Sequence, residues 1–451
     1  MPPKQGALEQ PKSGGGLPLE QHPARSQGVS RHVVITGLSV LAPGSTDTEG
    51  FWKMITAGRS AIRRITAFDP TPFRSQVAGE VDLDPLACGF TRREVRRLDR
   101  ASLLAVACAR RAVAEAGITS GAGIDPGRIG VSVGNAVGSA TSIENEYVVL
   151  SDEGRQWLVD QKYQSPHLFD YFVPGSLARE TAWAARAEGP VSVISAGCTS
   201  GIDALGHACQ LIQEGSADVM VAGATDAPVT PIAVACFDAI KATTRRNDDP
   251  ERAPRPFDRT RDGFAIAEGA AMLVLEDSEH ARRRGADIYG TITGYAAHSN
   301  AYHMTGLSRD GNEMARAIKT ALDEARTDPT AVGYINAHGS GTKQNDLHET
   351  EAFKKALGEH AYNVPVSSIK SMIGHSLGAI GAIEVATCAL AIRNGVVPPT
   401  ANLHEPDPDC DLDYVPLEAR DVDLDVVLTV GSGFGGFQSA MVLEKWRGGR
   451  A

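Results

Sequence analysis

Residues 191–215 read VSVISAGCTSGIDALGHACQLIQEG, and this stretch indicates how the chain folds. Its first four residues predict a short strand, followed by a turn of small residues. Apolar residues then recur at helical spacing, and the pattern stops before Gly215, a typical helix terminator. A second apolar run at 218–223 predicts another strand. Strand, turn, helix and strand in this order indicate an α/β protein with packed layers.

The same order of elements returns later in the chain. Residues 364–397 read VPVSSIKSMIGHSLGAIGAIEVATCALAIRNGVV, which predicts a strand, a glycine-containing turn, a long helix and a strand at Val396-Val397. The two stretches share a pattern rather than an identity, as expected for an internal duplication. We therefore predict two similar halves that meet near residues 277–288, covering 31–280 and 281–448.

Further segments fill these halves. Apolar or Ala-rich patterns predict strands at 32–37, 128–134, 289–295 and 332–335, and helices at 103–114 and 314–325. The run at 426–430 is predicted to be the last strand. Residues 1–30 are rich in Pro, Gly, Gln and Ser, and we expect a disordered tail there rather than a signal peptide.

Composition limits the function classes. The net charge of −11 argues against nonspecific binding to nucleic acid, and an acidic partner would need a local basic patch. The seven cysteines lack a Cys-x-x-Cys pair, so we expect neither a disulfide framework nor a structural zinc site. We also expect no transmembrane helix, and a cytoplasmic protein with reduced thiols.

Cys198 is the first candidate for chemistry. It follows a strand and opens a predicted helix, where the helix dipole favours a thiolate. Its small neighbours leave room for an acyl group and expose backbone N–H groups to a developing oxyanion. A buried core thiol is the alternative interpretation. We prefer that alternative for Cys209 and Cys388, which lie at apolar positions within predicted helices.

Two histidines lie in glycine- and serine-rich turns. His338 follows the strand at 332–335, and active sites of α/β proteins gather at such strand ends. His375 occupies the turn between the strand near 364–369 and the following helix. A histidine in such a loop is a better catalytic candidate than one on a helix face.

Three motifs suggest rival chemistries. Ser367-x-x-Lys370 matches a β-lactamase nucleophile, but its companion motifs are missing. Residues 374–378 match the Gly-x-Ser-x-Gly elbow of α/β-hydrolases, but only Glu384 and His404 follow as acid and base, and Glu384 lies within a predicted helix. Residues 431–436 match Gly-x-Gly-x-x-Gly, yet too few residues follow for a dinucleotide-binding unit. We set all three aside.

Taken together, the motifs resemble one family. A Gly-Cys-x-Ser-Gly turn at 197–201, a His-Gly-x-Gly-Thr loop at 338–342, a Lys-x-x-x-Gly-His turn at 370–375 and a Gly-Phe-Gly-Gly loop at 433–436 look like a β-ketoacyl synthase. The similarity extends to residues 255–264 and 268–270, and it runs from about residue 33 to 445. It implies the thiolase fold, with two βαβαβαββ halves in a five-layered α/β/α/β/α core.

The resemblance also implies a mechanism. Cys198 would accept an acyl chain from the phosphopantetheine of an acyl carrier protein, and His338 and His375 would assist decarboxylation of a malonyl thioester. Lys370 and Glu349 would form a buried pair that holds the histidines. The N–H groups of Cys198 and Phe434 would form the oxyanion hole, with Phe434 also acting as a gate. No metal and no intrinsic cofactor is implied.

Other residues would hold the carrier. Ser340 and Thr342 would bind the pantetheine arm, with loop capping as the alternative interpretation. Lys241, Arg245 and Arg246 are candidates for a basic patch that meets the acidic carrier protein, with a solvated charge run as the alternative.

The subtype follows from departures within the family. Residues 197–199 and 435–438, together with 147–151 and 166–174, look like the ketosynthase α subunit of type II polyketide synthases. Such subunits typically pair with a chain-length factor, a homologue that lacks the catalytic cysteine. A β-ketoacyl-[acyl carrier protein] synthase II that elongates fatty acids as a homodimer is the close alternative. A thiolase and a non-catalytic chain-length subunit fit less well, because the chain has a histidine where thiolases use a second cysteine and keeps Cys198.

Overall fold

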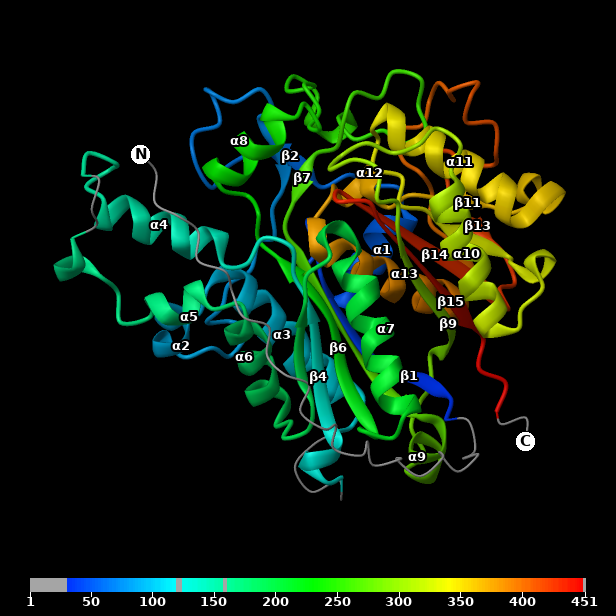
Figure 1. Ribbon diagram of the computed structural model, residues 1–451, viewed down its shortest axis with the longest axis horizontal. Coiled ribbons are helices and arrows are strands. Elements are labelled where there is room, and N and C mark those ends of the chain that lie inside the picture. The colour runs from blue at the N-terminus through cyan, green and yellow to red at the C-terminus, as the bar shows by residue number, and fades with distance from the viewer. Residues whose placement is uncertain (1–30, 119–123, 157–159, 449–451) are drawn as a thin grey trace, which may run out of the picture. The chain divides into compact units, whose positions relative to one another are not determined.

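The structure, a computed structural model, describes residues 31–118, 124–156 and 160–448. The tail expected at residues 1–30 lies outside these residues. The main sheet contains ten strands in the order β11-β10-β14-β15-β9-β1-β8-β6-β4-β5 (Figure 1). Strands of the first half are β1 (Val33–Leu41), β4 (Ile129–Gly134), β5 (Val191–Ile194), β6 (Val219–Asp226) and β8 (Gly269–Asp277). Strands of the second half are β9 (Gly290–Ser299), β10 (Tyr334–Asn336), β11 (Val366–Ser367), β14 (Val426–Gly433) and β15 (Phe437–Glu444).

The strand order repeats on either side of the centre of the sheet. Outwards from the centre, one half runs β1, β8, β6, β4, β5 and the other runs β9, β15, β14, β10, β11. In each half the two inner pairs are antiparallel and the two outer pairs are parallel. Residues 33–35 of β1 pair with residues 290–292 of β9 and join the two halves. This repeat confirms the predicted duplication.

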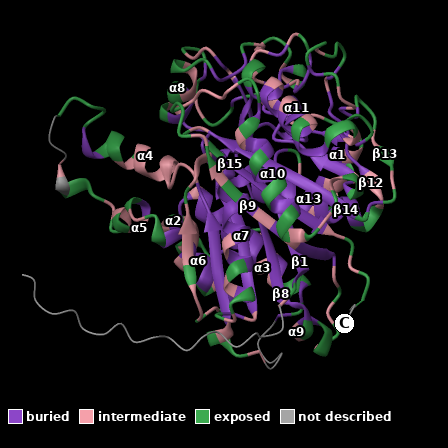
Figure 2. Ribbon diagram, turned by 45° about the vertical axis from the view of Figure 1, so that its right-hand side comes forward, coloured by how far each residue is buried: buried purple, intermediate pink, exposed green. Residues whose placement is uncertain are grey.

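Helices lie in three layers around the two halves of the sheet. One outer layer is α3 (Arg100–Glu115) with α6 (Gly175–Ala185), and the other is α10 (Asn312–Ala325) with α11 (Lys343–Leu357). The middle layer is α7 (Ser200–Gln213) with α13 (Ile380–Asn394), which contact each other and strands of both halves. Three large hydrophobic clusters correspond to these layers. Buried residues accordingly fill α13 and the inner strands of the main sheet in Figure 2.

The burial of α13 explains its composition. Residues Leu377–Asn394 are long and apolar enough to cross a membrane, but 89% of this segment is buried inside the protein. A helix that is apolar on all sides is stable when other elements surround it, and both halves of the sheet surround α13. Its composition is therefore that of a central core helix.

Smaller elements complete the described chain. Additional helices are α1 (Thr48–Thr56), α2 (Arg92–Arg97), α4 (Ala140–Leu150), α5 (Leu168–Phe172), α8 (Pro231–Ala239), α9 (Ser278–Arg283) and α12 (Lys370–Ile373). Strands β2 (Ile62–Arg64), β3 (Val77–Gly79) and β7 (Ile266–Ala267) form a small sheet, and β12 (Val396–Val397) pairs with β13 (Arg420–Asp421).

Two expectations about strands were wrong. The run at 426–430 belongs to β14, which is not the last strand, because the chain turns through the glycine-rich loop and returns as β15. The polar residues Gln438 and Ser439 at the start of β15 hid its strand pattern. The strand at Val396-Val397 lies outside the main sheet, and the counterpart of β6 is β14. Residues 395–425 separate α13 from β14.

Candidate functional site

Cys198 lies in a single turn of 3-10 helix, η3 (Gly197–Thr199), between β5 and α7. Gly197 has a φ of +60°, a conformation that side chains disfavour. The end of β14 packs directly against this turn, since a Cβ added to Gly433 would lie 3.2 Å from the Cys198 nitrogen. Glycine at both positions therefore lets two backbone segments meet at the cysteine.

The surroundings of the Cys198 thiol oppose and favour ionisation at once. Burial raises the pKa of Cys198 to about 12, whereas the charge of Lys370 and a hydrogen bond from the Phe434 N–H lower it. The sulfur also lies at the N-terminal end of α7, where the helix dipole favours negative charge. An N–H donor already directed at the sulfur can serve an oxyanion that forms next to it.

His338 and His375 reach the site from different elements. His338 follows β10, and its N–H and that of Gly339 donate to the Glu349 carboxylate at 2.5 and 2.7 Å. The backbone of His375 is held against β7, donating to Ala265 and accepting from Ala267. The two ring centroids lie 5.3 Å apart with planes at 83°.

The environment of both imidazoles disfavours their protonation. Burial, together with the nearby charge of Lys370, holds the pKa of each histidine well below 6.5. The Nδ1 atom of each ring is enclosed and has no hydrogen-bond partner among the described residues. Nε2 is thus the nitrogen of each ring that can meet a ligand. A neutral imidazole that carries its proton on Nε2 is a hydrogen-bond donor to a developing negative oxygen.

The buried lysine has a different partner from the one expected. Lys370 forms an ion pair with Glu384 and donates to the His338 carbonyl. The expected ion pair with Glu349 is absent among the described residues, because the Glu349 oxygens already bind the two N–H groups of the His338 loop. Burial raises the pKa of Glu349 to about 8 and that of Glu384 to about 7, the latter opposed by Lys370.

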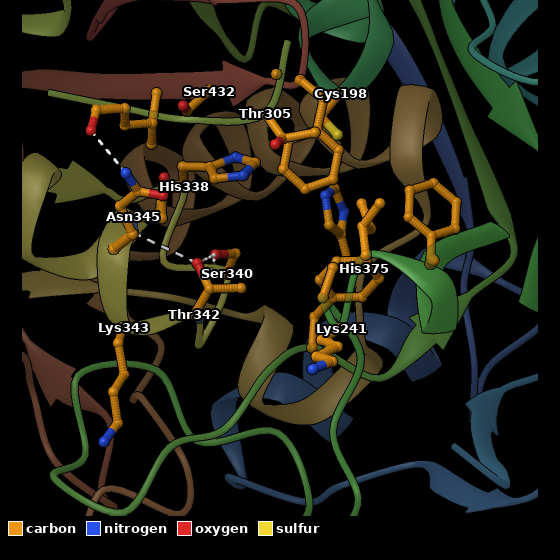
Figure 3. Close-up of a pocket in the computed structure, with 18 residues that line it drawn as sticks. Cys198, Lys241, Thr305, His338, Ser340, Thr342, Lys343, Asn345, His375 and Ser432 are labelled. Carbon is orange, nitrogen blue, oxygen red and sulfur yellow. Dashed lines mark hydrogen bonds between the residues drawn. The ribbon is translucent and has the colours of Figure 1, made fainter. Parts of the chain in front are cut away.

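A cavity of about 270 Å³ brings the predicted residues together. Cys198, His338, His375 and Phe434 all line it. Ser340 and Thr342 line another part of its wall (Figure 3). Further lining residues are Phe237, Ile240, Lys241, Ala242, Phe264, Thr305, Leu307, Lys343, Gln344, Asn345, Ser432 and Gly433. The site thus joins a thiol, two neutral imidazoles and an apolar wall.

Aromatic side chains form part of that wall. Phe434 stacks on Phe237 with centroids 6.4 Å apart, and Phe264 meets His375 edge-on at 5.0 Å. Phe434 belongs to the loop between β14 and β15, so its position depends on the hairpin rather than on a rigid helix.

Ser340 and Thr342 play a structural part as well. Their hydroxyls lie 3.0 Å apart, and Thr342 caps α11 by accepting from the Asn345 N–H. The alternative interpretation as capping residues is therefore correct for Thr342. The same two hydroxyls border the cavity, where a ligand could bind them.

The predicted basic residues gather at a second hollow. Lys241, Arg245 and Arg246 line an open hollow of about 1000 Å³ together with Arg74 and Lys343. Lys241, Thr342 and Lys343 border both this hollow and the cavity with Cys198. In Figure 3 the ends of the two lysines point away from Cys198. Positive charge is therefore concentrated at one entrance to the site.

The rejected motifs have structural roles. Ser376 of the elbow-like motif is 1% exposed, and it is not part of the cavity wall. The glycines at 431–436 end one strand and begin the return to the next, so no helix follows them to bind a dinucleotide. The described residues contain no group of three or more His, Cys, Asp or Glu arranged to hold a metal ion.

Family models match both halves of the chain. The N-terminal domain of β-ketoacyl synthases matches residues 30–281, and the C-terminal domain matches residues 289–404. The chain belongs to the β-ketoacyl synthase family. It is accordingly a condensing enzyme of the acyltransferase class, and its fold is the thiolase fold.

Individual relatives refine this assignment. The granaticin polyketide β-ketoacyl synthase 1 of Streptomyces violaceoruber is 66% identical over 92% of this chain and 99% of the relative. The ketoacyl synthase α subunit of the tetracenomycin polyketide synthase of Streptomyces glaucescens is 60% identical over 92% of this chain and 97% of the relative. A ketosynthase solved in complex with its type II polyketide acyl-carrier protein superimposes on this chain with a TM-score of 0.87 at 38% identity. The match covers 93% of this chain and 100% of the solved chain. This β-ketoacyl synthase therefore resembles ketosynthase α subunits of type II polyketide synthases.

Sequence reasoning missed several residues of the site. Glu384 is the only acidic residue in the buried segment 377–392, and a lone acid in an apolar helix is a signal for a buried partner. Phe237, Phe264 and Thr305 come from segments far apart in the chain, and no local pattern connects them.

Proposed function

We propose that this β-ketoacyl synthase catalyses decarboxylative Claisen condensation between malonyl-carrier protein and an acyl chain on Cys198, within a type II polyketide synthase. The observation that carries the proposal is one cavity shared by the Cys198 thiol, two neutral histidines and the Phe434 N–H. Thiol, imidazole donors and a preformed N–H donor are the groups that thioester condensation needs.

The first step is transfer of the acyl chain. The Cys198 thiolate attacks the carbonyl carbon of an acyl-pantetheine thioester, and the oxygen becomes negative. The N–H groups of Cys198 and Phe434 stabilise this oxyanion. The C–S bond to pantetheine then breaks, and the free pantetheine thiol takes up the proton lost by Cys198. One thioester replaces another, so the step needs no external energy source.

The second step uses the histidines. The bond between the carboxylate and the α-carbon of the malonyl thioester breaks, CO2 leaves, and its electron pair forms an enolate. The Nε2–H groups of His338 and His375 donate to the enolate oxygen. The α-carbon attacks the acyl-Cys198 carbonyl, and the cysteine leaves as a thiolate. In this proposal Lys370 and Glu349 position the histidine turns, and Phe434 acts as a gate between the two steps.

The carrier protein delivers both substrates on its phosphopantetheine arm, and no intrinsic cofactor takes part. Ser340 and Thr342 border the cavity and would bind the arm. Lys241, Arg245 and Arg246 line the basic hollow at its entrance and would meet an acidic carrier surface. This local patch supports the proposal because the chain as a whole carries a net charge of −11.

A second subunit completes the proposed enzyme. We propose a heterodimer with a chain-length-factor homologue. The solved ishigamide ketosynthase/chain length factor supports this proposal: it superimposes with a TM-score of 0.85 at 33% identity, covering 93% of this chain and 100% of the solved chain. We further propose that the domains divide at residues 280/281, with Cys198 in the first half and His338, Lys370 and His375 in the second. The cytoplasm is the proposed location, and all seven cysteines are free.

The test is a reconstituted condensation. The protein is purified alone and with the neighbouring Cys-lacking homologue, then supplied with malonyl-loaded carrier protein. We expect poly-β-ketones only with the homologue present, and a mass increase on Cys198 when an acyl-carrier is added. Extension of saturated acyl chains by the protein alone would instead support the fatty-acid alternative. Absence of any acyl group on Cys198 would rule out both.

A further inference from the structure

A buried carboxylate lies behind the nucleophile turn and has no part in the proposed reaction. Asp203 belongs to the first turn of α7 and is 8% exposed. Its carboxylate accepts three hydrogen bonds from hydroxyls, at 2.7 Å from Thr199, 3.0 Å from Tyr295 and 2.5 Å from Ser439. Burial raises the pKa of Asp203, and the three hydroxyls lower it. A carboxylate accepts from hydroxyls on both oxygens, so it can hold three groups at once.

The three hydroxyls come from three elements that build the active site. Thr199 directly follows Cys198 in η3. Ser439 lies in β15, shortly after the loop that carries Phe434. Tyr295 lies in β9, and the chain after β9 leads to Thr305 on the cavity wall. Asp203 therefore connects the nucleophile turn with β15, which follows the Phe434 loop, and with β9.

The packing around this network leaves little room for movement. Ser439 pairs with Gly431 in the β14–β15 ladder, and a Cβ added to Gly431 would lie 3.2 Å from the Thr199 methyl carbon. One added to Gly433 would lie equally close, at 3.2 Å, to the Cys198 nitrogen. A shift of Thr199 relative to β14 therefore changes the separation of the Cys198 and Phe434 N–H groups.

We propose that Asp203 is a positioning residue for acyl transfer: by holding Thr199 and Ser439 on one carboxylate, it sets the spacing of the two N–H donors around the Cys198 sulfur. This inference rests on the proposed function, because it concerns the acylation of Cys198. Asp203 touches neither cavity nor thiol, and it acts through Thr199.

The first experiment measures acylation of Cys198 from a carrier-free acyl thioester by rapid-quench mass spectrometry. In Asp203→Asn the amide offers one acceptor oxygen and a donor, so at least one hydroxyl loses its bond. We expect the maximal acylation rate to fall about 10- to 100-fold with little change in KM, as misplacement of reacting groups predicts. Decarboxylation of malonyl-carrier, which uses the two histidines, should stay within about twofold. Asp323→Asn, an exposed aspartate on α10, is the matched control.

Substitutions at Thr199 provide a test that does not change charge. Thr199→Val keeps the shape of the side chain but removes the hydroxyl, and it should slow acylation to the same extent as Asp203→Asn. Thr199→Ser restores the hydroxyl and should restore the rate. The double variant Asp203→Asn/Thr199→Val should acylate no more slowly than the slower of the two single variants, because the two residues act through one contact.

Alkylation by iodoacetamide separates this inference from the proposed function. We expect the pH midpoint of Cys198 alkylation to move upward in Thr199→Val, since the thiolate would lose alignment with the Phe434 N–H. If the unsubstituted protein is never acylated, the proposed function fails, while this alkylation shift still tests Asp203. Unchanged acylation and alkylation in Thr199→Val would overturn the inference. Equal losses of acylation and decarboxylation with a lowered Tm would also overturn it, because they would indicate a general structural role.

Discussion

The imidazole rings of His338 and His375 stand nearly perpendicular, with centroids 5.3 Å apart and both side chains buried. Protonation of either ring is unfavourable, because burial and the Lys370 charge disfavour a further cation and lower the pKa. In the proposed reaction the pair therefore acts as two hydrogen-bond donors rather than as one acid and one base. This property has a measurable consequence for stability.

We predict that the two histidines make the protein less stable as pH falls below 6.5. The unfolded chain binds protons there while the folded histidines do not, so the free energy of unfolding decreases as pH falls toward the folded pKa. Each histidine contributes at most about 1.4 kcal/mol per pH unit. Glu349 and Glu384, whose pKa values are raised, titrate in the opposite sense. The measurement is therefore the difference in the free energy of unfolding between wild type and His375→Asn, obtained from urea unfolding at pH values from 7.5 to 5.5.

As pH falls below 6.5, the wild type should lose up to about 1.4 kcal/mol more of its free energy of unfolding per pH unit than His375→Asn does. The matched control is His404→Asn, a substitution at an exposed histidine. A constant difference between wild type and His375→Asn across the range would contradict a depressed histidine pKa.

The Lys370–Glu384 pair predicts a double-mutant cycle. Removing one partner leaves the other charged and buried, so Lys370→Met or Glu384→Gln should each destabilise the protein by about 3–5 kcal/mol. The double variant should regain much of this loss, because no charge remains unpaired. Urea unfolding measures all four proteins.

Malonyl decarboxylation by these variants should not follow their stability. Lys370 also donates to the His338 carbonyl, so the double variant should remain slow in malonyl decarboxylation even where its stability recovers. Additive destabilisation in the double variant would show that the two residues do not form the pair described above.

Substitution of the nucleophile should separate the two half-reactions. Cys198→Ala removes the acyl acceptor, so condensation and acyl labelling should disappear. Malonyl decarboxylation should persist, because the enolate is stabilised by the histidines. Mass spectrometry and CO2 release measure the two steps. Cys236→Ser replaces an exposed cysteine and should keep both. Acyl labelling that survives in Cys198→Ala would place the nucleophile elsewhere.

The basic hollow predicts an effect on the carrier alone. Lys241→Glu reverses a charge at the entrance, so KM for malonyl-carrier should rise about tenfold at low salt, and the effect should weaken as salt screens it. Decarboxylation of a carrier-free malonyl thioester should change little. Lys319→Glu, on the exposed face of α10, is the control. An equal rise in KM for both substrates would show that Lys241 acts inside the cavity rather than on the carrier.

Local patterns predicted most of the elements, since a strand or helix depends mainly on its own period of apolar residues. The stretches at 191–223 and 364–397 revealed the duplication because each repeats strand, turn and helix. They failed at β15, which follows Gly435 and Gly436 and has the polar residues Gln438 and Ser439 near its start. These polar side chains are buried against partners from other parts of the chain, which no local pattern can show.

The sequence by itself determined the fold class, the family and the three candidate residues Cys198, His338 and His375, because each of the three lies next to a glycine in a short motif. Only the tertiary structure decided which groups surround them. Lys370 pairs with Glu384 rather than Glu349, and Asp203 binds Thr199 and Ser439, through contacts between separate elements. Such pairings depend on how sheets and helices pack, and the choice among buried acids is made by distance and by which of their oxygens are already occupied.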